Sequence, residues 1–166
     1  MTTPFLELYR EIPLSKGKTA FVSEQDYERL SGYRWFSHLR SGNWYAHRNG
    51  PTLEGKRAFV MMHHDVIGKP VTGMVTDHIN GNSLDNRRSN LRHASYSENA
   101  RNRKTRRTST TGLKGVSPKK DNGKWTASIY VSGKRKHLGV FSTPQEAHVA
   151  YCEAASKFYG EFARTA

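Results

Sequence analysis

The sequence predicts an α+β protein. A mixed α+β N-terminal region leads into a ββα unit, and a separate three-stranded antiparallel sheet packed on one helix follows. Apolar and polar residues alternate over 124–131, which is the period of a strand with one buried face. Apolar residues then recur every three or four positions from Ala147 to Phe158, as on one face of a helix. Upstream, short strand-like segments are separated by glycine turns, with no repeat at a fixed period.

Composition restricts the class of protein. The chain has 166 residues, with 27 basic and 14 acidic side chains and a net charge of +13. Its single cysteine, Cys152, excludes a disulfide framework and a zinc site built from several thiolates. The longest apolar run, 58–62, is too short to span a membrane, and the first ten residues lack a signal-peptide core. We therefore expect a cytoplasmic, monomeric protein with a polyanionic partner, and neither a membrane nor an organic cofactor.

Basic charge is concentrated in residues 101–120, which contain eight basic and no acidic side chains. A Ser/Thr run and Gly112 follow the densest part, which is typical of a linker between modules. We predict domains at 1–102 and 112–166, joined by a basic linker over 103–111. A solvated charge run is the alternative, but phosphate contact is favoured because both neighbouring segments also indicate nucleic acid. The predicted contacts are Arg101, Arg103, Lys104, Arg106 and Arg107.

Residues 1–60 are expected to be rich in strands. Residues 7–22 indicate two short strands around a glycine turn, and Ser23 is placed to cap a helix that ends near Gly32. Residues 33–49 predict a hairpin, and 56–64 a further strand. The aromatic side chains of this region are expected to pack in the core: Trp35, Phe36, Trp44 and Tyr45.

Residues 74–102 carry polar side chains that a ββα unit could bring into one pocket. Asp77 and Asn99 offer hard oxygen ligands, which suit Mg²⁺ and not zinc. His78 follows Asp77 and is placed as a general base for water, because its free pKa lies near working pH. Asn90 could orient the His78 ring through its second nitrogen. This chemistry suits phosphodiester cleavage with one divalent ion, Mg²⁺ or Mn²⁺.

The string DHINGNSLDNRRSNLR, followed by SEN and Asn102, resembles the HNH (His-Me finger) endonuclease family, especially its phage and intron-encoded homing branch. The similarity reaches back to MMHHDVIG, which is expected to be a strand. The resemblance implies a ββα-metal fold around a single divalent ion. It also implies that Asp77 and Asn99 are metal ligands, that His78 is the general base and that Asn90 holds His78.

Other polar residues of this segment are given structural roles. The homing branch usually has Arg at the position of His64, so a possible phosphate contact is missing. His63 is expected to support the core or a strand rather than to act in catalysis. His64 and His93 are expected at the surface, and Asp85 and Asn86 are expected to stabilise their own loop.

The C-terminal segment predicts a reading module. Thr143 and Glu146 form a capping box with Pro144 at the first helical position, and Gly160 ends the helix. With that helix on one face, the other face of the sheet is free and polar, and it could enter a major groove. A small solvated sheet is the bland alternative. The free face is expected to carry Lys119, Lys124, Thr126, Ser128, Tyr130 and Arg135.

The order Gly-Val, Gly-Lys-Trp-x-Ala-x-Ile, Leu-Gly-x-Phe and Glu-Ala…Ala-Tyr…Ala-Ala resembles the Apetala-2 (ethylene-response-factor) DNA-binding domain over nearly all of 112–163. The resemblance implies that the sheet enters the major groove of double-stranded DNA. Ser117 and Tyr130 replace arginines of the family, so its target sequence is not carried over. The implied contact positions are Lys114, Ser117, Lys119, Lys124, Ser128, Tyr130, Arg135 and His137.

Together these features predict a site-specific DNA endonuclease, of a homing or phage-encoded mobile-element kind, acting in a bacterial host. A DNA-binding regulator with an inert nuclease fold is the alternative. The joint presence of Asp77, His78, Asn90 and Asn99 favours the enzyme, because a decayed site should have lost at least one of them. An RNA-binding protein is disfavoured, since the sheet aromatics are too few for base stacking.

Overall fold

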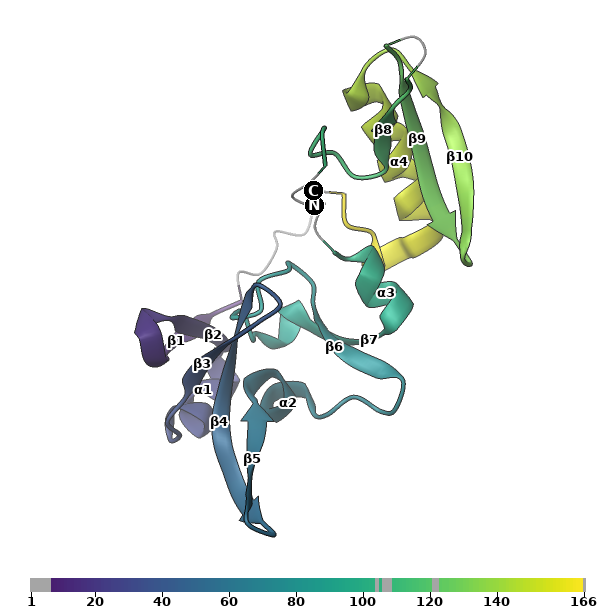
Figure 1. Ribbon diagram of the computed structural model, residues 1–166. Coiled ribbons are helices and arrows are strands. Elements are labelled where there is room, and N and C mark those ends of the chain that lie inside the picture. Colours follow the sequence, from purple (N-terminus) through teal and green to yellow (C-terminus); the bar gives the residue numbers. More distant parts are fainter. Residues whose placement is uncertain (1–6, 104, 106–108, 121–122, 166) are drawn as a thin grey trace. The chain divides into compact units, whose positions relative to one another are not determined.

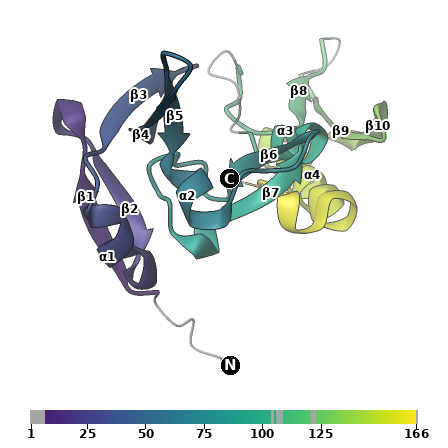
Figure 2. The same cartoon turned by 90° about the horizontal axis from the view of Figure 1, so that it is seen from below.

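The computed structural model describes residues 7–103, 105, 109–120 and 123–165. It divides into two compact units, Met1–Tyr96 and Ser97–Ala166, each of which is described by itself (Figures 1 and 2). The α+β class is confirmed, since small antiparallel sheets and few helices make up the described residues. No helix among them is long and apolar enough to cross a membrane. The predicted contacts Lys104, Arg106 and Arg107 lie outside the described residues.

The first unit contains a two-stranded sheet, β1–β2, a three-stranded sheet in the order β3–β4–β5, and the hairpin β6–β7. All neighbouring strands are antiparallel. Its elements are β1 (Tyr9–Pro13), η1 (Ser15–Gly17), β2 (Thr19–Ser23), α1 (Glu24–Ser31), β3 (Phe36–Arg40), β4 (Asn43–Leu53), β5 (Lys56–Met61), α2 (Met62–Ile67), β6 (Met74–His78), η2 (Arg88–Asn90) and β7 (Leu91–Ser95).

The hairpin and the first helix confirm the sequence prediction for residues 23–49. The β3–β4 turn places Ser41 and Gly42 at φ of 50° and 80°, as the preferred two-residue hairpin turn requires. Helix α1 lies between Ser23 and Gly32, but the Ser23 side chain makes no capping bond. Its Oγ instead donates to Glu7 at 2.5 Å and accepts the backbone N–H of Arg88 at 2.9 Å. Ser23 therefore connects the helix start to the loop that precedes β7.

The strand expected over 56–64 is wrong in its last three residues, and the strand expected over MMHHDVIG is wrong from Met62 onward. Strand β5 ends at Met61, and Met62–Ile67 forms the short helix α2. Met62 and Val66 are one helical turn apart and both are buried, so helical spacing places both in the core. Gly68, at φ 82°, follows the helix. His63 and His64 consequently lie on a helix.

The core of the first unit joins β1, β2, α1, α2 and β7. Trp35 is buried there, and its Nε1 donates to the carbonyl of Leu30 at 2.8 Å. The core prediction is not met by Phe36, Trp44 and Tyr45, which are only half-buried. Phe36 and Tyr45 lie on the face of β3 and β4 opposite the buried Ser37 and Ala46, and Trp44 lies near the end of the hairpin. The buried apolar residues are Ile12, Leu14, Ala20, Val22, Leu30, Trp35, Ala46, Met62, Val66 and Leu91.

The second unit is a three-stranded antiparallel sheet in the order β10–β9–β8, with helix α4 packed against it (Figure 1). Helix α3 begins at the boundary between the units and, from Ser97 onward, belongs to the second. The elements are α3 (Tyr96–Arg101), β8 (Val116–Pro118), β9 (Trp125–Val131), β10 (Lys134–Phe141), α4 (Pro144–Tyr159) and η3 (Gly160–Phe162).

Helix α4 confirms its predicted start and its close approach to the sheet. The Thr143 hydroxyl accepts the N–H of Glu146 at 3.2 Å, and the Glu146 carboxylate accepts the N–H of Thr143 at 3.4 Å. The side chains buried against the sheet recur every four residues, and include Ala147, Tyr151 and Ala155. Gly115 is required beside them, because a Cβ there would lie 2.0 Å from the Tyr151 ring.

Candidate active site

The β6–β7 hairpin presents Asp77 and His78 at its end. Asp77 pairs with Arg92 across the hairpin, and His78 pairs with Leu91. Both site side chains are buried. The Asp77 carboxylate accepts the Nε–H of Arg92 at 3.0 Å and forms an ion pair with its second guanidinium nitrogen at 2.9 Å. Arg92 thus neutralises and orients the carboxylate that precedes His78.

The loop between β6 and η2 is organised around Asp85. This carboxylate accepts two guanidinium bonds from Arg87, at 2.8 and 2.7 Å, and one from the Asn80 side-chain amide at 2.7 Å. Burial raises the pKa of Asp85, but the hydrogen bonds and charge of Arg87 outweigh burial and lower the pKa overall. The predicted loop-stabilising role of Asp85 is confirmed.

The N-terminal strands hold this loop in place, a role that the sequence did not indicate. The backbone of Phe21 on β2 donates to Leu84 at 2.9 Å and accepts from Asn86 at 2.7 Å. Ser83 donates to the carbonyl of Trp44 on β4 at 2.6 Å. These bonds join strands distant in the sequence to the loop beside His78, so residues from β2 and β4 form part of the frame of the site.

A buried carboxylate on α1 anchors the end of the same loop. Asp26 accepts a bidentate pair of bonds from Arg88, at 2.7 and 2.9 Å, and a further bond from Arg29 at 2.9 Å. Burial raises the pKa of Asp26, but the hydrogen bonds and charges of Arg88 and Arg29 lower it below its ordinary value. Asp26 is therefore ionised at neutral pH and fixes η2 to α1.

Two amides of the loop lie around His78, and Asn86 also keeps its predicted loop-stabilising role by donating to the carbonyl of Leu84 at 3.1 Å. Asn90 accepts the N–H of Asn80 at 2.9 Å and donates to the carbonyl of Asp85 at 2.7 Å, so it closes the loop and does not hold the His78 ring. Asn86 lies nearer, with its Oδ1 3.5 Å from Nε2 of His78. The expectation for Asn90 is corrected because its amide is used by the backbone. Both residues are amides of one polar loop, so composition gave no means of choosing between them.

Two rings, those of His63 and Tyr45, pack around His78. The His63 ring stands edge-on to the His78 ring with centroids 5.3 Å apart. Tyr45 lies 6.1 Å from His63 and 6.3 Å from His78. Burial, followed by the charges of His78 and His64, lowers the pKa of His63 to about 3. A neutral, buried His63 fits the predicted supporting role, and Tyr45 is a neighbour of the site that the core prediction missed.

His78 has the protonation state that a base needs. Burial lowers its pKa, against the opposing effects of the Asn86 hydrogen bond and the charges of Asp77 and Asp85. The imidazole is therefore neutral at neutral pH and has a nitrogen lone pair with which to accept a proton. A proton acceptor beside a fixed carboxylate and a constrained loop is the arrangement of a hydrolytic site.

Comparison with known proteins identifies the segment. Residues 62–101 match the family model described as HNH endonuclease. These residues are an HNH endonuclease domain. An uncharacterized HNH endonuclease of Acanthamoeba polyphaga mimivirus is 29% identical over 148 residues, which are 89% of this chain and 74% of the viral protein. By the domain and this homology the chain is a nuclease, a class of hydrolase.

A second relative matches a shorter stretch of the chain. Protein 3.8 of Escherichia phage T7 is 39% identical over 66 residues, which are 40% of this chain. The match covers 54% of the phage protein, so the chain spans just over half the length of that relative. Neither relative's name specifies a target sequence.

The predicted metal ligands are Asp77 and Asn99, whose side-chain oxygens are hard donors. Within the described residues, no three His, Cys, Asp or Glu side chains are grouped so as to hold a metal. A carboxylate from Asp77 and an amide oxygen from Asn99 fit a hard ion that keeps several waters. Asn99 lies on α3 in the second unit, so its proximity to Asp77 stays a prediction.

The predicted reading residues of the C-terminal sheet share one face. Tyr130 pairs with Arg135, and Ser128 with His137, on β9 and β10. Ala127 and Ile129 between them are buried on the α4 side. Ser117 opposes Thr126 on the same outer face, which places hydroxyl, aromatic, imidazole and guanidinium groups side by side. Arg135 also donates to the Ser128 hydroxyl at 3.1 Å.

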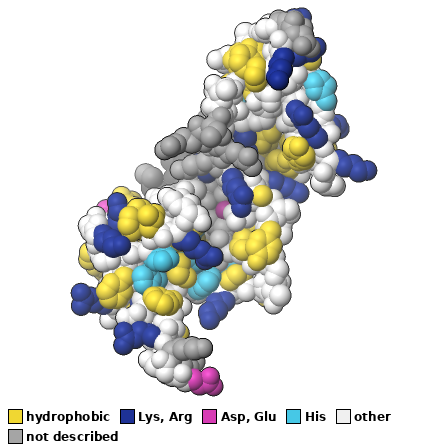
Figure 3. Space-filling view, in the orientation of Figure 1, with side chains coloured by type: hydrophobic (Ala, Val, Ile, Leu, Met, Phe, Trp, Pro, Cys, Tyr) yellow, Lys and Arg dark blue, Asp and Glu magenta, His cyan; other side chains and the backbone are white. Residues whose placement is uncertain are grey.

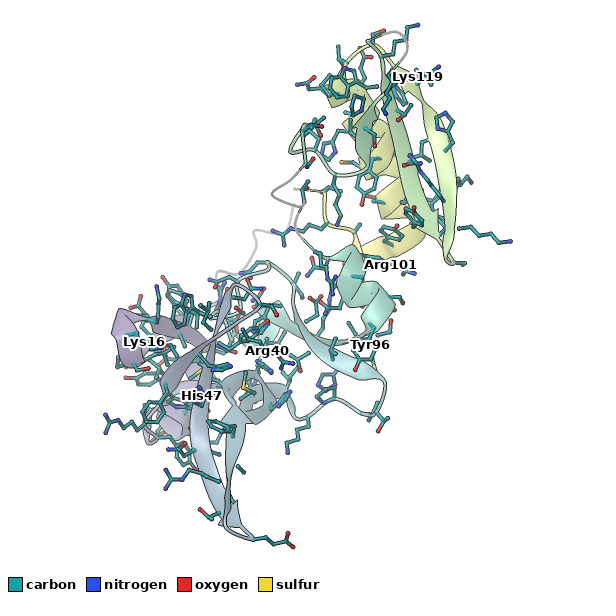
Figure 4. All side chains as sticks on the ribbon, viewed as in Figure 1. Lys16, Arg40, His47, Tyr96, Arg101 and Lys119 are labelled. Atoms are coloured by element: carbon teal, nitrogen blue, oxygen red, sulfur yellow. The ribbon has the colours of Figure 1, made fainter. Side chains whose placement is uncertain are left out.

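Two other predicted DNA contacts, Lys114 and Arg101, bind neighbours within the second unit, whereas Lys119 and Lys124 continue this face of the sheet by strand alternation. The Lys114 ammonium donates to the carbonyls of Arg101 and Arg103, and burial together with the charge of Arg164 lowers its pKa to about 8. The Arg101 guanidinium lies 4.8 Å from the Tyr159 ring centroid. Lys119, labelled in Figure 4, follows β8. Its backbone N–H donates to the carbonyl of Lys124, the residue before β9, at 2.8 Å.

Proposed function

We propose that the chain is a site-specific DNA endonuclease that hydrolyses a phosphodiester bond with one divalent ion, Mg²⁺ or Mn²⁺. The observation that carries this proposal is the buried, neutral His78 beside the Arg92-bound carboxylate of Asp77, at the end of a rigid hairpin. A homing or mobile-element role is part of the proposal, supported by the resemblance of the sequence to that branch.

The chain's own groups supply the acid–base chemistry. His78 accepts a proton from the water that attacks phosphorus, since its ring is neutral before the reaction. The ring packing of Tyr45 and His63 and the nearby Asn86 limit the directions in which His78 can turn. A general base positioned in this way typically contributes about 10²–10⁴ in rate.

Asp77 and Asn99 would hold the divalent ion. When bound, the ion supplies positive charge for a non-bridging phosphate oxygen and for the leaving 3′ oxygen. The ion pair with Arg92 fixes the orientation of the Asp77 carboxylate. Loss of either proposed ligand should raise the concentration of metal that the enzyme needs.

The C-terminal sheet is proposed to read the DNA sequence. Its outer face places Ser128, Tyr130 and Arg135 together, and a sheet of this width fits the major groove. The Apetala-2 resemblance supports this assignment. A monomer with one active site would cut one strand and leave a nick.

Replacement of His78 tests the nuclease proposal. Purified His78→Ala should lose at least about 10² in cleavage rate on supercoiled plasmid, yet bind DNA as the wild type does. His93→Ala is the matched control, because His93 lies on the same hairpin and its Nε2 lies 3.3 Å from the carbonyl oxygen of Gly68. Cleavage by His78→Ala at the wild-type rate would remove His78 as the base.

A further inference from the structure

The β3–β4–β5 sheet has an outer face that the HNH assignment leaves unused. Cross-strand partners share a face of a sheet, and so do alternate residues of one strand. The register pairs Phe36 with His47 and His38 with Tyr45, and alternation adds Arg40 to this side. On β5, Met61 opposes His47, and Phe59 follows by alternation. We call this the outer face: Phe36, His38, Arg40, Tyr45, His47, Phe59 and Met61.

Rings form a continuous ladder across this face. The His47 ring lies 5.8 Å from Phe36, 5.8 Å from His38 and 5.2 Å from Phe59, measured between centroids. The Arg34 guanidinium lies 5.4 Å from the Phe36 centroid. Figure 3 shows histidine and apolar side chains gathered with basic ones over these strands, and Figure 4 labels Arg40 and His47 among them.

The ring ladder is more exposed to solvent than the opposite face of the sheet. Ser37 and Ala46, on the opposite face, are buried, whereas His38 and Arg40 are exposed and Phe59 retains 68% of its surface. Phe59 continues a patch of rings, and a contiguous exposed apolar patch marks an interaction surface. The sequences of β3, β4 and β5 contain no acidic residue. An apolar surface ringed by arginine and histidine complements a polyanion.

The outer face runs directly into the active site. Tyr45 belongs to it and also contacts the rings of His63 and His78. If the scissile phosphate of a nucleic acid strand lies at His78, the neighbouring nucleotides lie next to the outer face of the first unit. Rings with interspersed arginines are suited to such a strand, because sugars and bases pack on rings while guanidinium groups bind phosphates.

We propose that the outer face binds substrate DNA next to the scissile phosphate, with Arg34 and Arg40 on phosphates and the ring ladder against sugars or bases. The proposal rests on the nuclease function proposed above. It gives the N-terminal region a direct part in substrate binding, separate from sequence reading by the C-terminal sheet.

Binding measured on the full chain tests this surface. A fluorescein-labelled DNA duplex of mixed sequence is titrated in EDTA at several salt concentrations, so that no cleavage occurs. Arg40→Ala should weaken binding and lower the slope of log affinity against log salt by about 0.9, the loss of one phosphate contact. Phe59→Ala should weaken binding about fivefold or more with the slope unchanged.

Matched controls come from the same unit. Leu8→Ala removes an equally exposed apolar side chain, and Arg10→Ala removes a half-exposed arginine paired with Glu24, both outside the outer face. Both controls should bind as the wild type does. Because Phe59 and Arg40 are exposed, thermal unfolding of their variants should coincide with that of the wild type.

Each contrary outcome has a distinct meaning. Wild-type affinity and slope in both Arg40→Ala and Phe59→Ala would overturn the DNA-binding face and leave the nuclease function standing. A wild-type chain that never cleaves with any divalent ion would refute the nuclease function, while this binding test would still be decided. Self-association that Phe59→Ala abolishes, with DNA affinity unchanged, would assign the face to a second copy and overturn the proposal.

Discussion

At the scale of single residues, the properties of the site come from neighbours distant in the sequence. Asp77 is held by Arg92 and His78 is made neutral by burial, while Asn86 and two further rings restrict its orientation. The loop beside it is fixed by Asp26, which lies 62 residues before its partner Arg88. The chemistry of the candidate site therefore depends on a carboxylate that takes no part in it.

Asp26→Asn should destabilise the chain in a pH-dependent way. The folded pKa of Asp26 lies below its ordinary value of 3.8, so its contribution is complete above that value and is lost as pH falls through the folded pKa. At neutral pH the loss of charge-assisted bonds should lower the free energy of unfolding by about 2 kcal/mol.

Urea unfolding of wild type and Asp26→Asn across a pH series measures this difference. The two free energies of unfolding should converge at acid pH. A difference that stays constant through the acid range would contradict the ionised pair, and Glu28→Gln, an exposed neighbour on the same helix, should change little at any pH.

The sequence named candidate site residues, whose roles stay predictions, but it did not give their contacts. Asp77, His78 and Asn90 were identified as a group, because strand periodicity and the polar loop place them near one another. The contact of Asn90 was wrong, since a loop with several amides can satisfy its backbone in more than one way. Tyr45 was assigned to the core because alternation does not say which face of a strand is covered.

At the scale of elements, local signals succeeded where the decisive contacts are local. The capping box of α4 needs only Thr143 and Glu146, and both bonds form. Ser23 also occupies an N-cap position, yet its hydroxyl donates to Glu7 and accepts from the N–H of Arg88. The prediction for the end of β5 was wrong for a similar reason. Helix α2 begins at Met62 because other elements of the core bury Met62 and Val66.

Thr143→Ala should destabilise the second unit by about 1 kcal/mol, within the usual range of about 0.5–2 for a lost N-cap. The cause is the unsatisfied N–H of Glu146 at the helix start. Thermal unfolding followed by circular dichroism measures the effect, and Ser142→Ala is the adjacent control. Equal melting of Thr143→Ala and the control would show that the capping box adds no stability.

At the scale of the whole molecule, the chain consists of two compact units, Met1–Tyr96 and Ser97–Ala166, and its excess charge is concentrated between residues 101 and 120. Periodicity predicted the C-terminal three-stranded sheet and its long helix. The frame that β2 and β4 provide for the site loop was not predictable, because it rests on backbone bonds between segments far apart in sequence.

Sequence-independent DNA binding by the basic linker and sequence recognition by the C-terminal sheet should be separable in the full-length chain. Neutral replacements of Arg103, Lys104, Arg106 and Arg107 should weaken binding about equally on all sequences and reduce its salt dependence. Replacement of Lys119, Lys124 or Arg135 should instead change the preferred sequence, by about 1–3 kcal/mol for a side chain that reaches a base edge. Selection from random duplexes compares the two sets. A changed preference in the linker variant alone would reverse the assignment.

The most direct test of the central claim is cleavage of supercoiled plasmid with Mg²⁺, with Mn²⁺ and with EDTA, by the wild type and by Asp77→Ala. The wild type is predicted to produce nicked circles only when a divalent ion is present. Asp77→Ala is predicted to need a higher concentration of metal or to lose cleavage, whereas Glu54→Ala, in the exposed β4–β5 turn, should titrate normally. Cleavage by the wild type in EDTA, or an unchanged metal titration in Asp77→Ala, would contradict the metal-dependent site at Asp77 and His78.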